Sequence, residues 1–385
     1  MGLIEVLESR KIFLWICGLW PKEYQHKPKL SQMKLYFIWF NMLMMCLLVF
    51  AGLVAIATPD NIPQFLTDFI GFAAAASKLI PFVHNRKRMM KVIMETLKLE
   101  ETSKFENDND LEIIRSWRRT RDGVLKYHMR IYGFISVAYC FLPIISQVNT
   151  YPAQTIIQAS LFVSPWYEFF YGFHCAQLFL YLFIIIATDG LSMILIFKLC
   201  EELQRFECLL FERHRADDAT LSEKYKSRGE FLRCIIRKHC TILDYGESIC
   251  NLLTGALFTQ YFLLSGTLCF SVFTILSSNS SAMANQMSIM AGTCIVQLFM
   301  ISLAGELVST RSLALADALL QSDFCCSIFG ELKSSELRQT VLMQLRMQKP
   351  LKLSIGTLGV INIEFFSRIM KGVYSFTMLL RTSYV

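Results

Sequence analysis

Charged side chains within apolar segments are the residues of this chain best placed to do chemistry. Asp189 lies deep in an apolar stretch, where a carboxylate is costly unless it is paired or hydrated, and we expect it to have a structural role facing a helix bundle. The largely apolar stretch from Leu351 to Arg381 carries Glu364, Arg368 and Lys371. Glu364 and Arg368 are four residues apart and can pair on a helix. These three side chains could sit in a wet vestibule.

The sequence lacks the residue patterns of enzymes. It contains no glycine-rich phosphate loop, no His/Cys cluster with metal-ligand spacing, and no nucleophile near a base. Its 13 cysteines lie singly, or as the Cys325–Cys326 pair without a metal-ligand partner nearby, so we expect buried or reduced thiols. We therefore predict no catalytic residues, no bound metal and no cofactor.

The composition is that of a membrane protein. Of the 385 residues, 54% are hydrophobic and only 18% are charged, whereas a soluble domain carries about a quarter charged residues. A helix needs about 20 apolar residues to cross the hydrocarbon core. Seven segments are candidates, and Asp68 and Lys78 near the ends of the second can snorkel. The candidates are Met33–Ala57, Ile62–Val83, Lys126–Val148, Phe173–Leu199, Leu252–Ser277, Gln286–Val308 and a seventh from about Leu351 to Arg381.

The basic residues predict the orientation. Of the 38 Lys and Arg residues, 33 lie before the first segment, in three alternate connections, or at the segment ends that border them. The positive-inside rule places these parts in the cytoplasm, with the N-terminus inside and the C-terminus outside. The sequon at Asn279 lies in a connection predicted to be outside, where it could be glycosylated. This inverted orientation, and the absence of Asp-Arg-Tyr and Asn-Pro-x-x-Tyr motifs, argue against a G-protein-coupled receptor.

The cytoplasmic connections are predicted to be helical. Apolar residues at helical spacing continue the second and fourth segments beyond the membrane. We therefore expect a helical cytoplasmic bundle, packed either within the chain or against another subunit. The stripe that continues the second segment is Met89, Val92, Ile93, Thr96 and Leu97. The stripe that continues the fourth segment is Leu199, Leu203, Phe206 and Leu210.

The C-terminal region resembles that of insect odorant receptors. The resemblance rests on "ALADALLQSDF", on Gln348-Lys349-Pro350 followed by Gly356, and on Phe365-Phe366, Tyr374-Ser375-Phe376 and Leu379-Leu380-Arg381. "GLWP" near the N-terminus and "KHCTILDYGESIC" also look like the family. The chain resembles a ligand-tuning subunit, because it lacks the long insertion between the fourth and fifth segments that marks the shared co-receptor.

The resemblance implies an all-α membrane protein with seven transmembrane helices. It implies an odorant-gated, non-selective cation channel of four subunits, in which the co-receptor is the partner, in the plasma membrane of olfactory sensory neurons. The expected partners are a small volatile odorant, membrane lipids and permeating cations, and not nucleic acid. The expected divisions are residues 1–32 with an interfacial helix, 33–308 as helices one to six, 309–350 as cytoplasmic anchor helices, and 351–385 as the pore-lining seventh helix.

The family pattern also implies a gate at the outer end of the last helix. A continuous helix from Leu351 to Tyr384 would be about 50 Å long, which exceeds a hydrocarbon core of about 30 Å. Its upper part is apolar and could close a pore by dewetting. The gate would lie on the face formed by Phe376, Leu379, Thr382 and Ser383. Arg381 beside it would either snorkel to lipid headgroups or oppose cation entry.

An odorant needs an apolar pocket with one or two polar groups. In the family this pocket lies in the outer half of the bundle, and we expect His174 and Gln177 to supply the polar groups. The residues at the matching depth are Phe65, Phe69, Phe72, Ala73, Ser136, Tyr139, Cys140, Pro143, His174, Gln177, Leu178, Tyr181, Met290, Cys294 and Gln297.

Two other functions are open. A gustatory-type receptor of the same broad fold would answer to sugars or bitter compounds, but its signature near the last helix differs. A secondary transporter would usually show internal repeats and broken helices at the membrane midplane, and the sequence has neither.

Overall fold

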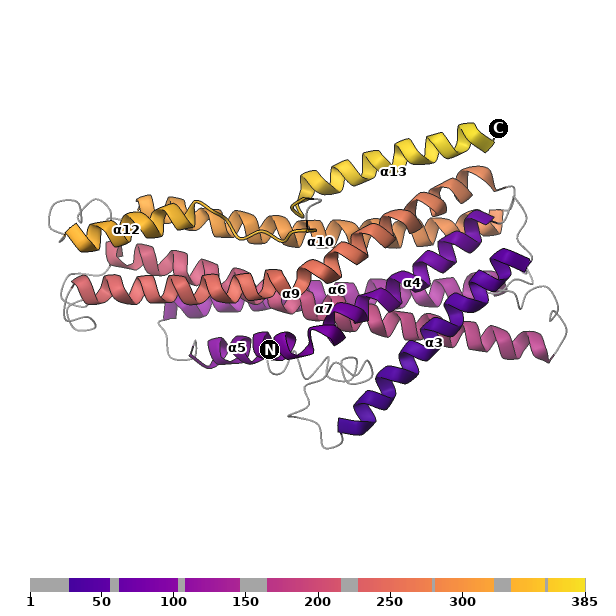
Figure 1. Cartoon of the computed structure of the whole chain (residues 1–385), viewed down its shortest axis with the longest axis horizontal. Helices are drawn as coiled ribbons and strands as arrows, with labels where there is room; N and C mark the ends of the chain where they lie inside the picture. Colours follow the sequence, from indigo (N-terminus) through magenta and orange to yellow (C-terminus); the bar gives the residue numbers. More distant parts are fainter. Residues whose placement is uncertain are drawn as a thin grey trace.

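The structure is a computed structural model that describes residues 28–55, 62–102, 108–145, 165–215, 228–278, 281–321, 334–356 and 359–384. Its helices run side by side along one long axis (Figure 1). They are α3 (Pro28–Ala55), α4 (Ile62–His84), α5 (Arg86–Thr102), α6 (Asp108–Ile145), α7 (Trp166–Arg215), α9 (Arg228–Ser277), α10 (Ser281–Gln321), α12 (Ser334–Met347) and α13 (Ile363–Tyr384).

Each of the seven predicted segments falls mainly on one helix, and the all-α, seven-helix fold is confirmed. α3, α4, α7, α9 and α10 each contain a segment long and apolar enough to cross a membrane. α6 and α13 complete the seven and carry more charge. The helices α7 and α9 contain 50 residues each, so each is about 75 Å long and extends well beyond a hydrocarbon core of about 30 Å.

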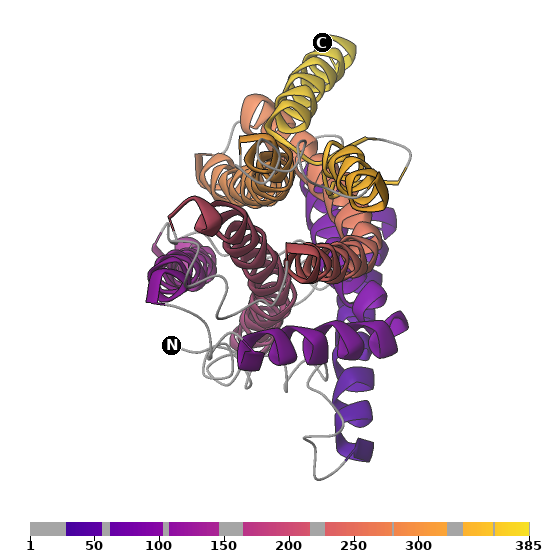
Figure 2. The same cartoon turned by 90° about the vertical axis from the view of Figure 1, so that its left-hand side faces the viewer.

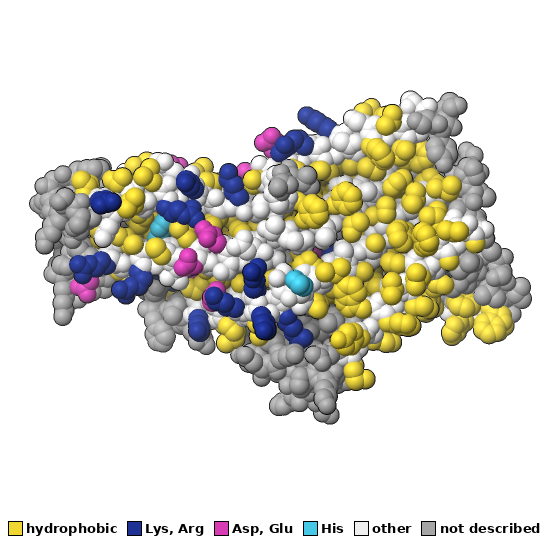
Figure 3. All heavy atoms as spheres, in the orientation of Figure 1, with side chains coloured by type: hydrophobic (Ala, Val, Ile, Leu, Met, Phe, Trp, Pro, Cys, Tyr) yellow, Lys and Arg dark blue, Asp and Glu magenta, His cyan; other side chains and the backbone are white. Residues whose placement is uncertain are grey.

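The two ends of the bundle differ in surface chemistry. One end, called here the apolar end, carries mostly hydrophobic side chains on the face seen in Figure 3. Its surface includes Phe37, Phe134 and Phe262, which are 65%, 74% and 70% exposed. The other end, called here the charged end, carries Lys, Arg, Asp and Glu side chains and includes α5 and α12 (Figures 1 and 3). This division fits a membrane around the apolar end only.

The apolar stripes of the predicted helical extensions form the core of the charged end. Met89, Val92 and Ile93 on α5 are buried, and so are Leu199, Leu203, Phe206 and Leu210 on α7. Next to them, Lys198 Nζ lies 2.8 Å from Glu202 Oε1, and Arg205 Nη1 lies 3.0 Å from the same oxygen. These extensions therefore pack within the chain.

α3 and α13 lie at opposite edges of the bundle (Figure 2). α3 packs on α4 and α7, and α13 packs on α9 and α10. The buried residues of α13 form a single stripe of Phe365, Val373 and Thr377, spaced at multiples of four residues. Most of the surface of α13 is therefore uncovered in the single chain.

The start of the last helix was predicted wrongly. α13 begins at Ile363 instead of near Leu351. Residues 351–356 and 359–361 form the two extended arms of a short hairpin, which are bridged at Ser354 and Val360. Gly356 and Gly359 have positive φ angles of 55° and 146°, which a helix cannot contain and other residues rarely adopt. The apolar residues alternate along this segment, and Leu351, Leu353 and Ile355 are buried.

The hairpin packs against α10 and leads into α13, at the junction of the charged and apolar ends (Figure 1). The Leu351 N–H donates to Ser312 Oγ at 2.9 Å, and the Ile363 N–H donates to Glu306 Oε2 at 3.4 Å. A Cβ atom on Gly305 would lie 2.2 Å from the carbonyl oxygen of Ile361. Because no side chain fits there, the backbones of α10 and the hairpin are in direct contact.

Two predictions fall outside what is described. The interfacial helix expected in residues 1–32 lies almost wholly before α3, and Asn279 lies between the described residues 278 and 281.

Candidate ligand-binding site

A separate apolar cluster lies at the apolar end of the bundle, between α3, α4, α6 and α7. We call it the outer cluster. Helical spacing produces it, because Phe65 and Phe72 on α4 are two turns apart, and Met45 and Val49 on α3 are one turn apart. Its buried members are Met45, Val49, Phe65, Phe72, Tyr139, Cys140 and Leu178. Phe69, Phe173, Cys175, Ile289 and Met290 are among the half-buried residues packed against it.

The outer cluster contains many of the residues predicted to line a ligand pocket. Those brought together in it are Phe65, Phe69, Phe72, Tyr139, Cys140, Leu178 and Met290. His174, Gln177, Cys294 and Gln297 are also buried, while Ala73, Ser136 and Tyr181 are half-buried. The side chain of Pro143 is outside the described set. Whether a ligand binds among these side chains stays a prediction.

Sequence reasoning missed the contribution of α3. The expected pocket used the second to sixth segments, yet Met45 and Val49 of the first segment are fully buried in the cluster. The signal was present, because Ile38, Met42, Met45 and Val49 recur with helical spacing and are all buried.

Several polar groups border the outer cluster, among them Asp68 and Gln286 beside the Tyr139 hydroxyl. Gln177 Nε2 donates to Asn41 Oδ1 at 3.0 Å, which joins α7 to α3. The Tyr171 hydroxyl donates to the carbonyl oxygen of Cys140 and joins α7 to α6. His174 is fully buried, and its ring centroid lies 6.1 Å from that of Phe173. An apolar surface with a few fixed polar groups is suited to a small, mostly apolar ligand.

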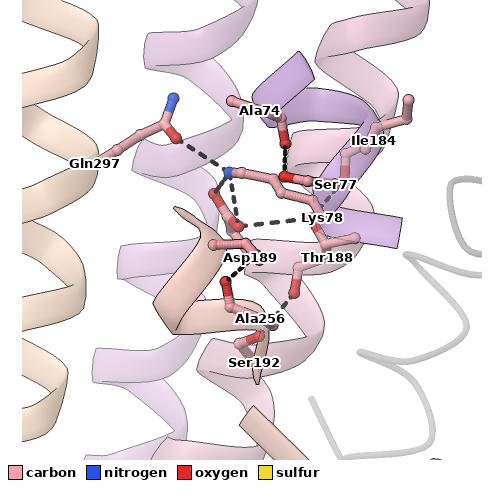
Figure 4. Close-up of polar contacts among 10 residues, drawn as sticks. Ala74, Ser77, Lys78, Ile184, Thr188, Asp189, Ser192, Ala256 and Gln297 are labelled. Atoms are coloured by element: carbon pink, nitrogen blue, oxygen red, sulfur yellow. Dashed lines mark hydrogen bonds and ion pairs between the residues drawn. The ribbon is translucent and has the colours of Figure 1, made fainter. Parts of the chain in front are cut away.

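A buried ion pair lies deeper in the bundle, between α4, α7 and α10 (Figure 4). Lys78 Nζ lies 3.0 Å from Asp189 Oδ1 and 2.8 Å from Asp189 Oδ2, and it donates to Gln297 Oε1 at 3.0 Å. Lys78 is 2% exposed and Asp189 is 9% exposed. The prediction of a structural, bundle-facing Asp189 is therefore supported, and its partner is Lys78.

The expectation that Lys78 and Asp68 snorkel was wrong. Both side chains are buried, at 2% and 3% exposure. For Lys78 the reason is the carboxylate of Asp189 opposite it, because a paired charge loses less free energy on leaving water than an unpaired one. A partner 111 residues away in the sequence cannot be recognised from local spacing.

The residues predicted to form a gate lie on the uncovered surface of α13. Phe376 is 42% exposed, Leu379 is 61% exposed, and Thr382 is also exposed. Nothing is described of the Ser383 side chain. The predicted pairing of Glu364 with Arg368 is present at 3.9 Å. The guanidinium of Arg368 also lies 5.5 Å from the ring centroid of Phe365.

Curated relatives of this chain are odorant receptors of Drosophila melanogaster. Odorant receptor 67c is 28% identical over 200 residues, which cover 52% of this chain and 46% of the relative. Putative odorant receptor 92a is 26% identical over 174 residues, which cover 45% of this chain and 40% of the relative. The matched regions therefore span less than half the length of these relatives.

The fold is similar to that of solved insect olfactory receptors. The structure of olfactory receptor OR5 from Machilis hrabei in complex with eugenol superposes with a TM-score of 0.80 at 15% identity, covering 99% of this chain and 98% of that chain. A second structure of the same receptor superposes with a TM-score of 0.76 at 16% identity, covering 98% of both chains. At such low identity the likeness establishes the fold alone.

The family is established by a match along most of the chain. The family model described as 7tm Odorant receptor matches residues 58–374, which include α4 to α12 and the first half of α13. This region contains the outer cluster residues of α4, α6 and α7, the Lys78–Asp189 pair and the hairpin. The chain is therefore a multi-pass membrane receptor of the insect odorant receptor family and not an enzyme.

Proposed function

We propose that this chain is the odorant-binding subunit of a heteromeric, ligand-gated, non-selective cation channel. A small volatile ligand binds in the outer cluster, and its binding opens a pore lined by α13. The other subunits are copies of the shared co-receptor, and the complex acts in the plasma membrane of olfactory sensory neurons. The N-terminus is cytoplasmic and the C-terminus is extracellular.

The uncovered surface of α13 carries the proposal of a pore. This helix buries one stripe against α9 and α10 and leaves Tyr374 and Leu379 more than 60% exposed. Its exposed surface also carries Glu364, Arg368 and Lys371, which are poorly suited to lipid. A helix with this mixture fits a position around a shared, partly wet axis, where apolar side chains near the outer end could close the path by dewetting.

The outer cluster and the hairpin support a link between ligand and pore. The outer cluster is formed by α3, α4, α6 and α7, whereas α13 packs on α9 and α10. α4 packs along α9 over much of its length. The hairpin then connects α10 directly to the start of α13. A small change in helix packing around the ligand therefore has a continuous path of contacts to the pore helix.

Current recording tests this proposal. The full chain is co-expressed with the co-receptor in cells that lack both, and whole-cell currents are recorded during application of a panel of volatiles. We expect ligand-dependent currents whose reversal potential changes little when Na⁺ is replaced by K⁺. Uptake of a volatile or a sugar without current would favour a transporter, and responses confined to sugars or bitter compounds would favour a gustatory-type receptor.

A tag after Val385 tests the orientation separately. Staining of this tag on intact cells is expected for an extracellular C-terminus, whereas staining only after permeabilisation would contradict it.

A further inference from the structure

We propose that the Gln297 side chain presents an N–H donor to the ligand and that Lys78 and Asp189 hold it in this orientation. The ligand is then an uncharged, largely apolar molecule with a hydrogen-bond acceptor at one end, such as a ketone, an ester or an ether. This inference rests on the proposed function, because it assumes that the ligand binds in the outer cluster. Gln297 would contact the ligand, while Lys78 and Asp189 would be positioning residues.

The hydrogen bonds of Lys78 are fully used. An ammonium group has three N–H donors and no acceptor. Its Nζ has acceptors at 3.0 and 2.8 Å on Asp189 and at 3.0 Å on Gln297. Lys78 therefore has no donor left for a ligand. Because an ammonium group can only donate, the atom of Gln297 that it contacts must be the amide oxygen.

This contact fixes which way the Gln297 amide points. If the amide were turned by 180°, its NH₂ group would face the ammonium, and two donor groups cannot hydrogen-bond to each other. The oxygen of the Gln297 amide must therefore be on the Lys78 side. The nitrogen then points away from Lys78, toward the end of the site that carries Ala74 and Ile184 (Figure 4). Both residues precede the ion pair on their helices, and on α4 and α7 the outer cluster lies in that direction.

The Gln297 nitrogen is a buried donor that is available for another acceptor. Gln297 is 2% exposed, and its Nε2 atom makes no hydrogen bond of normal geometry to the residues that the structure describes. The hydroxyls of Tyr132 and Tyr181 lie next to the same amide and can accept weakly from it, so a ligand acceptor would have to compete with them. A buried donor without a good acceptor is costly, so a ligand acceptor would gain binding free energy here.

Gln297 lies at the inner border of the outer cluster. Met290, Cys294 and Gln297 are spaced by four and three residues and share one face of α10. Met290 packs against the outer cluster, and Gln297 lies two turns farther along, at about 10 Å. Tyr181, beside the Gln297 amide, has its ring centroid 6.4 Å from that of Phe72 in the cluster. An elongated ligand among these aromatic rings would place one end near Gln297.

The ion pair argues against an anionic ligand. Lys78 and Asp189 neutralise each other, so the inner border of the cluster has polar groups but no net charge from this pair. An anion would have to leave water without a positive counter-ion from this pair, which is costly at this depth. An uncharged acceptor has no such penalty.

Matched ligands test the donor. Acetophenone and α-methylstyrene, and likewise heptan-2-one and 2-methylhept-1-ene, differ only in a carbonyl oxygen that is replaced by CH₂. In the complex of the full chain with the co-receptor, we expect each ketone that opens the channel to have a half-maximal concentration about tenfold lower than that of its alkene. In the Gln297→Leu variant, this ratio is expected to fall to about two.

Gln260→Leu is the matched control. Gln260 is a glutamine on α9 that is 4% exposed and also has an Nε2 atom without a described hydrogen-bond partner. It lies between Leu257 and Leu264 of the main core, and neither of these belongs to the outer cluster. Its replacement should keep the ketone-to-alkene ratio of the unaltered chain.

A double variant tests the positioning residues without leaving a buried charge. In Lys78→Met/Asp189→Leu, the Gln297 amide is free to turn its oxygen toward the ligand. We expect the ketone-to-alkene ratio to fall, because the amide is no longer held with its N–H groups toward the ligand, with surface staining confirming that the variant reaches the membrane. If Gln297→Leu fails to reach the surface, the double variant still tests whether Gln297 is the donor to the ligand.

The outcomes separate this inference from the proposed function. Equal responses to ketone and alkene in the unaltered chain, an unchanged ratio in Gln297→Leu, or unchanged ketone preference in the double variant would each overturn the role of Gln297 while leaving an odorant-gated channel intact. No ligand-dependent current with any volatile would overturn the proposed function and this inference together.

Discussion

The Nζ atom of Lys78 lies 2.8 Å from Oδ2 of Asp189, and both side chains are buried inside the helix bundle. The pair joins α4 to α7, and through Gln297 it also joins α10. The two charges are tolerated in these surroundings because the ammonium and the carboxylate neutralise each other. Replacing one residue or both should show whether one partner can be lost alone.

Loss of one member of this pair is expected to be more harmful than loss of both. Lys78→Met leaves the Asp189 carboxylate buried without its counter-ion, which costs about 3–5 kcal/mol of folding free energy. Lys78→Met/Asp189→Leu removes both charges and should recover most of this loss. Surface staining and the thermal unfolding midpoint of the detergent-solubilised protein measure the difference. A single variant as stable as the double variant would show that the pair contributes little.

The contact of Gly305 with the hairpin predicts a large effect of one methyl group. In Gly305→Ala the new Cβ would lie 2.2 Å from the carbonyl oxygen of Ile361, so α10 and the hairpin must separate. We expect a lower unfolding midpoint and weaker ligand-evoked current.

Two other glycines serve as controls for Gly305→Ala. In Gly246→Ala the new Cβ would meet the ends of the Leu351 and Leu199 side chains, which can move more easily than backbone, so the loss should be smaller. Gly292→Ala on α10 meets nothing within 4 Å and should be neutral or stabilising by up to about 1 kcal/mol. Equal effects of all three substitutions on the unfolding midpoint would argue against close backbone contact at Gly305.

The outer cluster predicts that Phe72→Ala weakens activation by every effective volatile. This substitution removes a buried aromatic ring that packs edge-on against Tyr181. Half-maximal concentrations should rise about tenfold for all ligands, because apolar contact is lost whatever polar group the ligand carries. Phe134→Ala provides the control, since Phe134 is 74% exposed on α6. A similar rise in both variants would mean that the outer cluster is not the ligand site.

The exposed surface of α13 predicts that Leu379→Ser opens the channel without ligand. If Leu379 faces the pore axis, a hydroxyl there would favour water in the narrow region and weaken closure by dewetting. Ligand-independent current, normalised to surface expression, should increase several-fold. Ser375→Ala changes another exposed position on the same helix and should leave this current unchanged. A silent Leu379→Ser channel with normal ligand responses would place the gate elsewhere.

The sequence was sufficient for those parts of the fold that depend on local patterns. Segment length and hydropathy located the helices of the seven predicted segments, except for the start of the last one, and helical spacing located the buried stripes at Met89 and Leu199. The hairpin was missed because Leu351, Leu353 and Ile355 were counted as apolar content. Their alternation with polar residues is the period of an extended strand, and it indicated the structure that is observed.

Relationships between distant segments could not be predicted in the same way. The outer cluster combines residues of α3, α4, α6 and α7, and the sequence alone gave only their types and approximate depths. The pairing of Lys78 with Asp189 depends on the rotation of two helices about their own axes. That rotation is set by packing along their whole lengths, which no short motif encodes.

The position of Asp189 along its helix has a mechanical consequence. It lies close to the middle of α7, which extends from Trp166 near the outer cluster to Arg215 at the charged end. Because the ion pair holds α7 near its centre, the helix would tilt about this point as a rigid body. A tilt of about 5° would move the two tips in opposite directions by about 3 Å each, given a length of about 75 Å. A small displacement at the apolar end would therefore arrive at the charged end reversed in direction and undiminished in size.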